Sequence, residues 1–152
     1  MQLALYQPDI PQNTGTMLRL CACLGVTAHL IEPAGFPISD KNFRRAGMDY
    51  LDQVEIRRHI GWTDFEIWRK DTGARLILAT TRGAIPYPDF AFRPDDIVMM
   101  GRESAGVPDD VHDAADARLL IPMRAGLRSI NVAVSAAMIL GEALRQTGMP
   151  SA

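Results

Sequence analysis

The chain has 152 residues, with 16 Lys and Arg against 18 Asp and Glu, and 47% of its residues are hydrophobic. A chain of this length forms one domain and buries about 68–70% of its unfolded surface, enough for a core without disulfides. The near-balanced charge excludes a histone-like protein that binds through bulk positive charge, and it excludes an acidic disordered tail.

Cysteine spacing and hydropathy bear on where the protein works. Cys21 and Cys23 fit neither a CxxC redox pair nor a zinc ribbon, so we expect reduced core thiols in a cytosolic protein. The N-terminus lacks the basic segment of a signal peptide. The longest apolar stretch, residues 130–144, is too short and too polar to cross a bilayer, which needs about 20 apolar residues. We therefore expect a soluble, cytoplasmic protein with no membrane partner.

Along the first half of the chain, short apolar runs alternate with helical patterns. Residues 3–6 predict a strand, and residues 14–24 predict a helix because apolar side chains recur at helical spacing as far as Gly25. Next in order come a strand at 28–31, a short helix at 41–46, a strand at 54–56 and a helix at 63–70, which Thr63 caps and Gly73 ends.

The second half continues the alternation. Residues 76–79 and 97–100 are continuous apolar runs, as expected of parallel strands buried on both faces. A last strand is predicted at 118–121 and a last helix at 129–146. The whole pattern predicts a single α/β domain over residues 1–152, with a mostly parallel sheet and flanking helices.

The predicted last helix is apolar on more than one face. Val132, Val134, Ala137, Ile139 and Leu144 point in several directions around a helix. Such a helix is buried on more than one side. We favour a subunit interface on the second face; the alternative is a helix enclosed within a single chain.

Three predicted strands are followed by loops that each contain glycine, at residues 79–83, 101–108 and 121–126. Their glycines allow a ligand to approach the backbone closely. Because the carboxyl ends of parallel strands meet at one edge of a sheet, these loops predict a pocket there. The 101–106 segment is neither GxGxxG nor a Walker A loop, which argues against a flavodoxin-like or nucleotide-hydrolysing domain.

Two interpretations fit the start of the first predicted helix. Asn13 and Thr14 are good helix caps, with Arg19 on the surface. Alternatively, the helix N-terminus attracts a phosphate and Arg19 adds a bidentate guanidinium. Basic residues elsewhere form a phosphate-binding patch or a solvated face, namely Arg44, Arg45, Arg57, Arg58, His59, Arg82, Arg124 and Arg128.

Several other residues are expected to be structural. No HExxH pattern or Cys/His spacing indicates a metal site. Trp62 and Trp68 are interpreted as packing residues. Satisfied or exposed structural positions are expected for His29 and His112, and the pairs Asp95-Asp96 and Asp109-Asp110 are expected to start a strand and cap a helix.

Four segments in order resemble the motifs of SPOUT-class RNA methyltransferases. They are residues 13–19, 44–50, 101–108 and 121–132. The sequence RRAGMDY at 44–50 is similar to the minimal subfamily of tRNA (cytidine/uridine) 2'-O-methyltransferases that act at the wobble nucleotide. The resemblance extends from residue 2 to about residue 148, and together the four motifs at matching spacing make it specific.

The resemblance implies a fold, a cofactor and an assembly. The C-terminal segment would thread through a loop as a deep trefoil knot, and the protein would be a homodimer. S-adenosylmethionine would bind to the three loops, mostly through backbone atoms of Ala79, Gly101, Ile121 and Ser129.

The resemblance also implies the catalytic residues. Arg19 would be central, with Asn13, Glu103 and Asn131 orienting the reacting groups, and Arg44 and Arg45 would bind the tRNA anticodon stem-loop. A guanidinium stays protonated, so we favour a phosphate-holding and charge-stabilising role for Arg19 over a general base. No metal is needed. The competing hypothesis is a non-catalytic RNA-binding or assembly module of α/β fold, which needs the basic residues but no glycine-lined pocket.

Two places depart from the family pattern. Residues 132–134 read Val-Ala-Val where close relatives usually carry Leu-Ser-Asn, so a polar contact is missing. Gly141 and Leu144 stand where relatives often have aromatic side chains. Both departures bear on dimer packing and substrate contacts rather than on the cofactor pocket.

Overall fold

The continuous apolar runs of the sequence form the centre of a parallel sheet. In the computed structural model, which describes residues 1–37 and 41–151, β1 (Gln2–Tyr6), β6 (Ile97–Met100) and β4 (Leu76–Ala79) lie side by side. Nearly all their side chains are buried, because helices cover both faces of the sheet. The strands predicted at 76–79 and 97–100 are confirmed.

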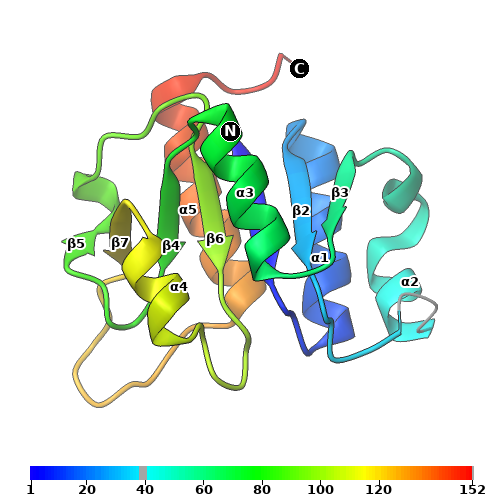
Figure 1. The fold of residues 1–152 in the computed structure, drawn as a ribbon, viewed down its shortest axis with the longest axis horizontal. Coiled ribbons are helices and arrows are strands. Elements are labelled where there is room, and N and C mark those ends of the chain that lie inside the picture. Colours follow the sequence, from blue (N-terminus) through cyan, green and yellow to red (C-terminus); the bar gives the residue numbers. More distant parts are fainter. Residues whose placement is uncertain (38–40, 152) are drawn as a thin grey trace.

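Four more strands extend this sheet to seven, in the order β3-β2-β1-β6-β4-β7-β5 (Figure 1). On one side are β2 (Thr27–Ile31) and β3 (Ile56–His59), and on the other are β7 (Ala117–Leu120) and the short β5 (Ile85–Pro86). Every pairing in the sheet is parallel. The predicted α/β class with flanking helices is confirmed.

Helices cover the two faces of the sheet in pairs (Figure 1). On one face lie α1 (Pro11–Leu24) and α5 (Val132–Thr147), and on the other lie α3 (Trp62–Thr72) and α4 (Asp109–Ala114). Beside α1, at the β3 end of the molecule, are α2 (Lys41–Gly47) and the 3-10 helix η1 (Met48–Asp52). A second 3-10 helix, η2 (Tyr87–Asp89), follows β5.

Successive side chains of the central strands point to opposite faces of the sheet and form two apolar cores, one on each face. Leu5 and Val98 pack with α1 and α5, whereas Leu78 and Met99 pack with α3 and α4. In the second core, the fully buried Phe65 of α3 lies between Trp62 and Trp68, with ring centroids 5.8 and 5.9 Å away. The interpretation of both tryptophans as packing residues is confirmed.

Several helix starts differ from the expectation. The first helix begins at Pro11 rather than at residue 14, because proline suits the first helical position, where its missing N–H has no partner to lose. The N-cap of α3 is Gly61 and not Thr63. Likewise, Pro108 caps α4, so Asp109 and Asp110 occupy the first turn, where their charge complements the helix dipole.

Two strands and the last helix also begin at residues other than those predicted. The strand expected at 54–56 lies at Ile56–His59, so the basic run there belongs to an edge strand. The last strand begins one residue early, at Ala117. The last helix begins at Val132 instead of residue 129, because the Asn131 side chain forms its cap.

The two cysteines have different environments. Cys21 is buried in the core between α1 and the sheet, but Cys23 is exposed. Residues two apart on a helix point about 200° apart, so both thiols cannot face the same core. The expectation of two core thiols is therefore wrong for Cys23.

The last helix is covered on one face within this chain. Ala136, Ile139 and Leu140 are fully buried, while Val134 is 50% exposed and Ala137 is exposed. The helix is thus not enclosed on all sides by the chain itself. Like every other helix in residues 1–37 and 41–151, it falls short of the length and apolar character needed to cross a bilayer.

Candidate functional site

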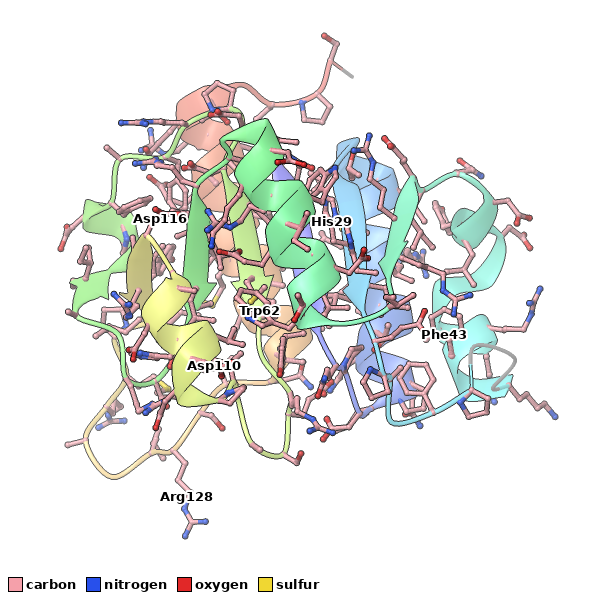
Figure 2. The ribbon with its side chains drawn as sticks, viewed as in Figure 1. His29, Phe43, Trp62, Asp110, Asp116 and Arg128 are labelled. Carbon is pink, nitrogen blue, oxygen red and sulfur yellow. The ribbon has the colours of Figure 1, made fainter. Side chains whose placement is uncertain are left out.

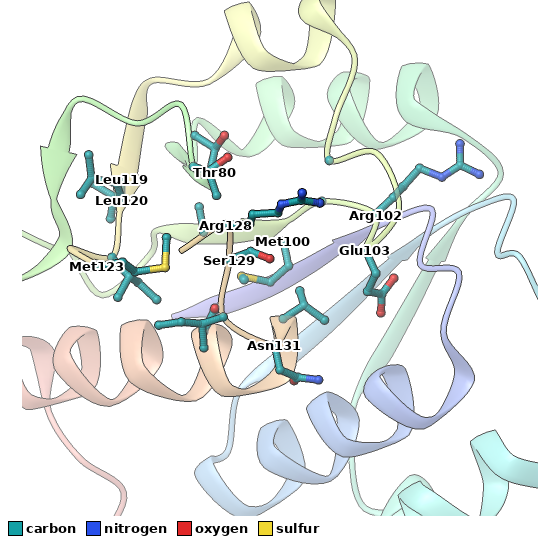
Figure 3. A pocket seen from close by; sticks show the side chains of 18 of the residues that line it. Thr80, Met100, Arg102, Glu103, Leu119, Leu120, Met123, Arg128, Ser129 and Asn131 are labelled. Carbon is teal, nitrogen blue, oxygen red and sulfur yellow. The ribbon is translucent and has the colours of Figure 1, made fainter. Parts of the chain in front are cut away.

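The carboxyl ends of β4, β6 and β7 open into a cavity of about 730 Å³ (Figure 3). Its walls come from the loops that follow these strands, at residues 80–81, 101–107 and 121–131. The start of α1 and the first turns of α5 complete it. The pocket predicted from the three loops is therefore present, at the expected edge of the sheet.

Close packing of glycines shapes two of these loops. A Cβ on Gly83 would lie 2.6 Å from the backbone carbon of Leu119, and a Cβ on Gly101 would lie 2.8 Å from that of Gly106. Arg102 and Gly106 also exchange two backbone hydrogen bonds, of 3.0 and 2.8 Å, and Gly106 has a left-handed φ of +66°. These glycines are required by the packing of the loops on neighbouring backbone.

All four residues expected to contact a cofactor line the cavity. Ala79 ends β4, Gly101 follows β6, and Ile121 and Ser129 belong to the long loop after β7. Apolar side chains from the sheet and from α5 form the inner wall, namely Leu78, Met100, Leu119 and Ile139. Ligand pockets span about 300–1,000 Å³ and combine apolar walls with a few polar groups, and this cavity fits that description.

Asn13 bridges two loops and does not cap its helix. The N-cap of α1 is Ile10, which makes no side-chain hydrogen bond there. Instead, Asn13 Nδ2 donates to Glu103 Oε1 at 3.2 Å, and Asn13 Oδ1 accepts from Asn131 Nδ2 at 3.0 Å. The capping interpretation of Asn13 is therefore wrong, and its side chain belongs to the cavity.

Asn131 has two tasks. Its Oδ1 accepts hydrogen bonds from the backbone N–H groups of Ala133 at 2.9 Å and Val134 at 3.3 Å, which caps α5. Its Nδ2 donates to Asn13. Figure 3 shows Glu103 and Asn131 both pointing toward the start of α1. Three of the four predicted catalytic residues thus form one hydrogen-bonded chain.

Asp9, which lies outside the four sequence motifs, extends this chain. Its backbone N–H donates to Glu103 Oε2 at 3.1 Å, and its Oδ1 accepts from the backbone N–H of Glu103 at 3.1 Å. Ser104 Oγ donates to Asp9 Oδ2. Asp9 lies three residues after the end of β1, and Glu103 lies three residues after the end of β6. Because β1 and β6 pair side by side, the strand order is what reveals that these two segments meet.

The two carboxyl groups influence each other. Burial raises the pKa of Glu103, and the neighbouring Asp9 carboxyl raises it further. The hydrogen bond with Glu103 lowers the pKa of Asp9, and the Ser104 hydroxyl acts in the same direction. At the cavity edge, Asp9 therefore carries the more stable negative charge of the pair.

Arg19 lies apart from the other three predicted catalytic residues. It is six residues beyond Asn13 on α1, a rise of about 9 Å along the helix, and it does not line the cavity. Its guanidinium lies over the ring of Tyr50 in η1, 4.7 Å from the ring centroid. Its catalytic role stays a prediction.

The basic residues fall into two groups. Among the arginines of the predicted phosphate-binding patch, three have carboxylate partners: Arg57 with Glu55 at 2.8 Å, Arg58 with Glu32 at 2.5 Å, and Arg82 with Asp109 at 3.2 Å. Arg44 and Arg45 are also exposed and lie in the last turn of α2, where they are not among the ion pairs of the described residues. Arg128 is exposed in the long loop at the cavity and extends away from the sheet (Figure 2).

His29 and His59 are core residues, whereas His112 is only partly buried and its Nε2 atom is buried without a hydrogen-bond partner among the described residues. His29 is fully buried beneath α3 (Figure 2), with its Nδ1 2.9 Å from His59 Nε2 and its Nε2 2.8 Å from Gln2 Oε1. Burial lowers the pKa of His29 to about 3, and His59 contributes. His29 is thus a neutral core residue, as expected. Within residues 1–37 and 41–151, no cluster of His, Cys, Asp and Glu suits a metal ion.

The fold and this site define the class of enzyme. The chain belongs to the SpoU rRNA Methylase family, which it matches over residues 1–141. Among its relatives is the tRNA (cytidine(34)-2'-O)-methyltransferase of Beijerinckia indica subsp. indica, 69% identical over 146 residues, which cover 96% of this chain and 91% of that protein. The family resemblance found in the four motifs is confirmed.

Solved structures agree with this assignment. One, from work on the 2-OH methylation of C/U34 on tRNA, has a TM-score of 0.91 and 39% identity, covering 95% of this chain and 94% of that one. Another is the SpoU methyltransferase AviRb from Streptomyces viridochromogenes in complex with the cofactor AdoMet. It has a TM-score of 0.85 and 26% identity, covering 96% of this chain and 60% of that one.

Proposed function

We propose that this protein transfers a methyl group from S-adenosylmethionine to the ribose 2'-oxygen of the wobble nucleotide, cytidine or modified uridine, of tRNA. The observation that carries the proposal is the cavity where three loops meet Asn13, Glu103 and Asn131. The names of its close relatives support the same substrate and position. A non-catalytic module would not need this cavity.

The residues present fit the cofactor. Backbone groups at Ala79, Gly101, Ile121 and Ser129 would hold the adenosine, and the apolar wall suits a purine and a thioether chain. The AdoMet complex of a family member supports this use of the cavity. When bound, S-adenosylmethionine supplies a methyl group on a cationic sulfur, which makes the methyl carbon open to in-line attack by an oxygen.

The chain's own residues would orient the ribose and manage its charge. Asn13, Glu103 and Asn131 would hold the 2'-hydroxyl close to attack distance, about 3–3.5 Å. Arg19 would hold the adjacent phosphate and stabilise negative charge developing on the 2'-oxygen. As the bond between the 2'-oxygen and the methyl carbon forms, the bond from that carbon to the cationic sulfur would break and leave a neutral thioether, and the hydroxyl proton would pass to that phosphate or to water.

We propose that two copies of the chain form the working enzyme. The exposed apolar Val134 and its neighbour Ala137 on α5 support a face that a second copy covers. Since Arg19 lies outside the cavity of its own chain, a dimer also allows residues of one subunit, including Arg44 and Arg45, to meet RNA bound at the other. The trefoil knot and the cytoplasmic location stay predictions.

Transfer of labelled methyl groups into an anticodon stem-loop tests the function. We expect incorporation into RNA with an ordinary ribose at the wobble position and none when that nucleotide is 2'-deoxy. Mass spectrometry of tRNA from cells lacking the protein should show loss of one 2'-O-methyl group there. Labelling of the 2'-deoxy substrate at equal rate would refute ribose methylation.

Calorimetry with S-adenosylmethionine distinguishes the methyltransferase hypothesis from the hypothesis of a non-catalytic RNA-binding or assembly module. We expect one cofactor site per chain, at the cavity after β4, β6 and β7. Tight tRNA binding without any cofactor binding would favour the module, because the basic residues alone suffice for RNA contact.

A further inference from the structure

Asp9 lies between β1 and α1 and connects this segment to the loop after β6 at the edge of the cavity. Its backbone N–H and its side-chain Oδ1 each form a hydrogen bond of 3.1 Å with Glu103, in opposite directions. The hydroxyl of Ser104 donates to its second carboxylate oxygen. The loop after β6 is therefore tied to the segment between β1 and α1 at three points.

The other side of Asp9 is closely packed. A Cβ on Gly35 would lie 2.9 Å from both Cα and Cβ of Asp9, so only glycine fits there without movement. Gly35 also donates its backbone N–H to the carbonyl of Pro8 at 2.8 Å. Asp9 is thus held between the turn after β2 and the loop after β6, and neither its backbone nor its side chain can shift freely.

From Asp9 the contacts run in one line across the site. Glu103 accepts from Asp9 at Oε2 and from Asn13 at Oε1, and Asn13 accepts from Asn131. Glu103 is the only member that touches both Asp9 and the cavity amides in this line. A rotation of the Glu103 carboxyl that moves both of its oxygens away from Asn13 Nδ2 breaks this contact.

We propose that Asp9 is a positioning residue for methyl transfer: it fixes the Glu103 carboxyl and, through it, the amides of Asn13 and Asn131 against the reacting ribose. This inference rests on the proposed function. It assigns a task to a residue outside the four motifs, and that residue does not itself line the cavity.

The charge of Asp9 gives the proposal a signature that a purely structural role lacks. Asp9, on the segment before α1, is the ionisable neighbour of Glu103, whereas Asn13 on α1 and Asn131 before α5 are neutral. Burial and Asp9 both raise the pKa of Glu103. Replacing Asp9 by Asn removes a negative charge, so the pKa of Glu103 falls.

A double-mutant cycle tests the proposal in the full-length protein, with Asp9→Asn, Glu103→Gln and the double variant. We expect Asp9→Asn to lower kcat about 10–100-fold, because small misplacements of reacting groups have effects of this size. The dissociation constant for S-adenosylmethionine should stay within about twofold. In the Glu103→Gln background, Asp9→Asn should change kcat less than about twofold, since its effect passes through Glu103.

The matched control is Asp71→Asn, on the exposed surface of α3, which should leave kcat and its pH profile unchanged. The acid limb of the kcat profile of Asp9→Asn should move to lower pH. Full additivity of the two substitutions, or equal loss of cofactor binding and kcat, would overturn the proposal. If Asp9→Asn does not fold, Ser104→Ala replaces it in the cycle, with a smaller loss of kcat that must also vanish with Glu103→Gln.

A readout independent of activity separates this inference from the proposed function. The pKa of the Glu103 carboxyl can be followed by NMR in the wild-type protein and in Asp9→Asn, with a downward shift expected. If the wild type does not methylate tRNA, the proposed function fails while the NMR result still decides whether Asp9 acts on Glu103. An unchanged pKa of Glu103 would count against Asp9.

Discussion

At the scale of single residues, the hydrogen-bonding partners of a polar side chain show whether it lies at the cavity or in the apolar core. Asn13 and His29 are both polar residues in helical or strand patterns. Asn13 bonds to Glu103 and Asn131 at the cavity, whereas His29 bonds to His59 and Gln2 beneath α3. Asn13 therefore lines the cavity, and His29 forms part of a buried pair of histidines.

Arg19→Ala tests the catalytic assignment made from the motif. Because Arg19 lies outside the cavity lining, its loss should leave cofactor affinity nearly unchanged while lowering methyl transfer at least about 100-fold. Single-turnover methyl transfer and cofactor calorimetry measure the two quantities. Arg93→Ala, on an exposed loop, serves as the control. A large fall in cofactor affinity would contradict the assignment.

His29 predicts a pH dependence of stability. Its pKa falls from 6.5 to about 3 in the folded protein, so the unfolded chain binds more protons between these values. The stability linked to His29 is complete above pH 6.5 and is lost as the pH falls toward 3. Urea midpoints measured at steps from pH 7 to pH 5 should fall in the wild type. A His29→Phe variant should show a flatter profile, and an equal slope in both would refute the prediction.

At the scale of elements, the start of α5 couples stability to the site. Asn131 caps the helix through Oδ1 and reaches Asn13 through Nδ2. Two different atoms of one side chain therefore serve two purposes, and substitutions can separate them.

We predict that Asn131→Asp preserves stability and impairs activity. An aspartate keeps the capping oxygen and suits the helix N-terminus, but it cannot donate to Asn13. Asn131→Ala should in addition destabilise the protein by about 1 kcal/mol. Chemical denaturation and methyl-transfer rates measure both effects. Equal stability of the Asp and Ala variants would show that the cap contributes little.

At the scale of the whole molecule, the sheet brings distant loops to one edge and leaves the cationic α2 at the other end (Figure 1). Arg57, Arg58 and Arg82 each form an ion pair with a carboxylate, whereas Arg124 and Arg128 are exposed at the cavity. We therefore expect Arg44 and Arg45 to make more phosphate contacts than Arg57 and Arg58, whose charges are already paired.

The salt dependence of tRNA binding tests whether Arg44 and Arg45 contact more phosphates than Arg57 and Arg58 do. Each phosphate contact contributes about −0.9 to the slope of log K against log salt for a duplex, and about −0.7 for a single strand. Arg44→Ala with Arg45→Ala should reduce the magnitude of the slope by about 1.5–2. Arg57→Ala with Arg58→Ala is the matched control and should change it little. A flat response in the wild type would remove the argument for these arginines.

The local pattern of the sequence was enough for the sheet strands at 76–79 and 97–100 and for the three loops around the cavity. Continuous apolar runs and glycines after them act within a few residues, so they are visible without a fold. Helix caps were less visible, since Gly61 and Pro108 carry no side-chain signal for capping. Asn13, Glu103 and Asn131 form hydrogen bonds with one another and Arg19 lies outside the cavity lining, while the catalytic roles of all four stay predictions.

Sequence alone determined the class of fold, the family and the identity of the loops that form the cavity, because each is written in residues close together in the chain. Only the tertiary structure decided that Asp9 meets Glu103 across 94 residues, that Cys23 faces solvent, and that Arg19 lies over Tyr50 away from the cavity. These facts depend on which strands become neighbours and on how helices rotate against the sheet. Both are set by the packing of the whole core, and no single segment of the sequence specifies that packing.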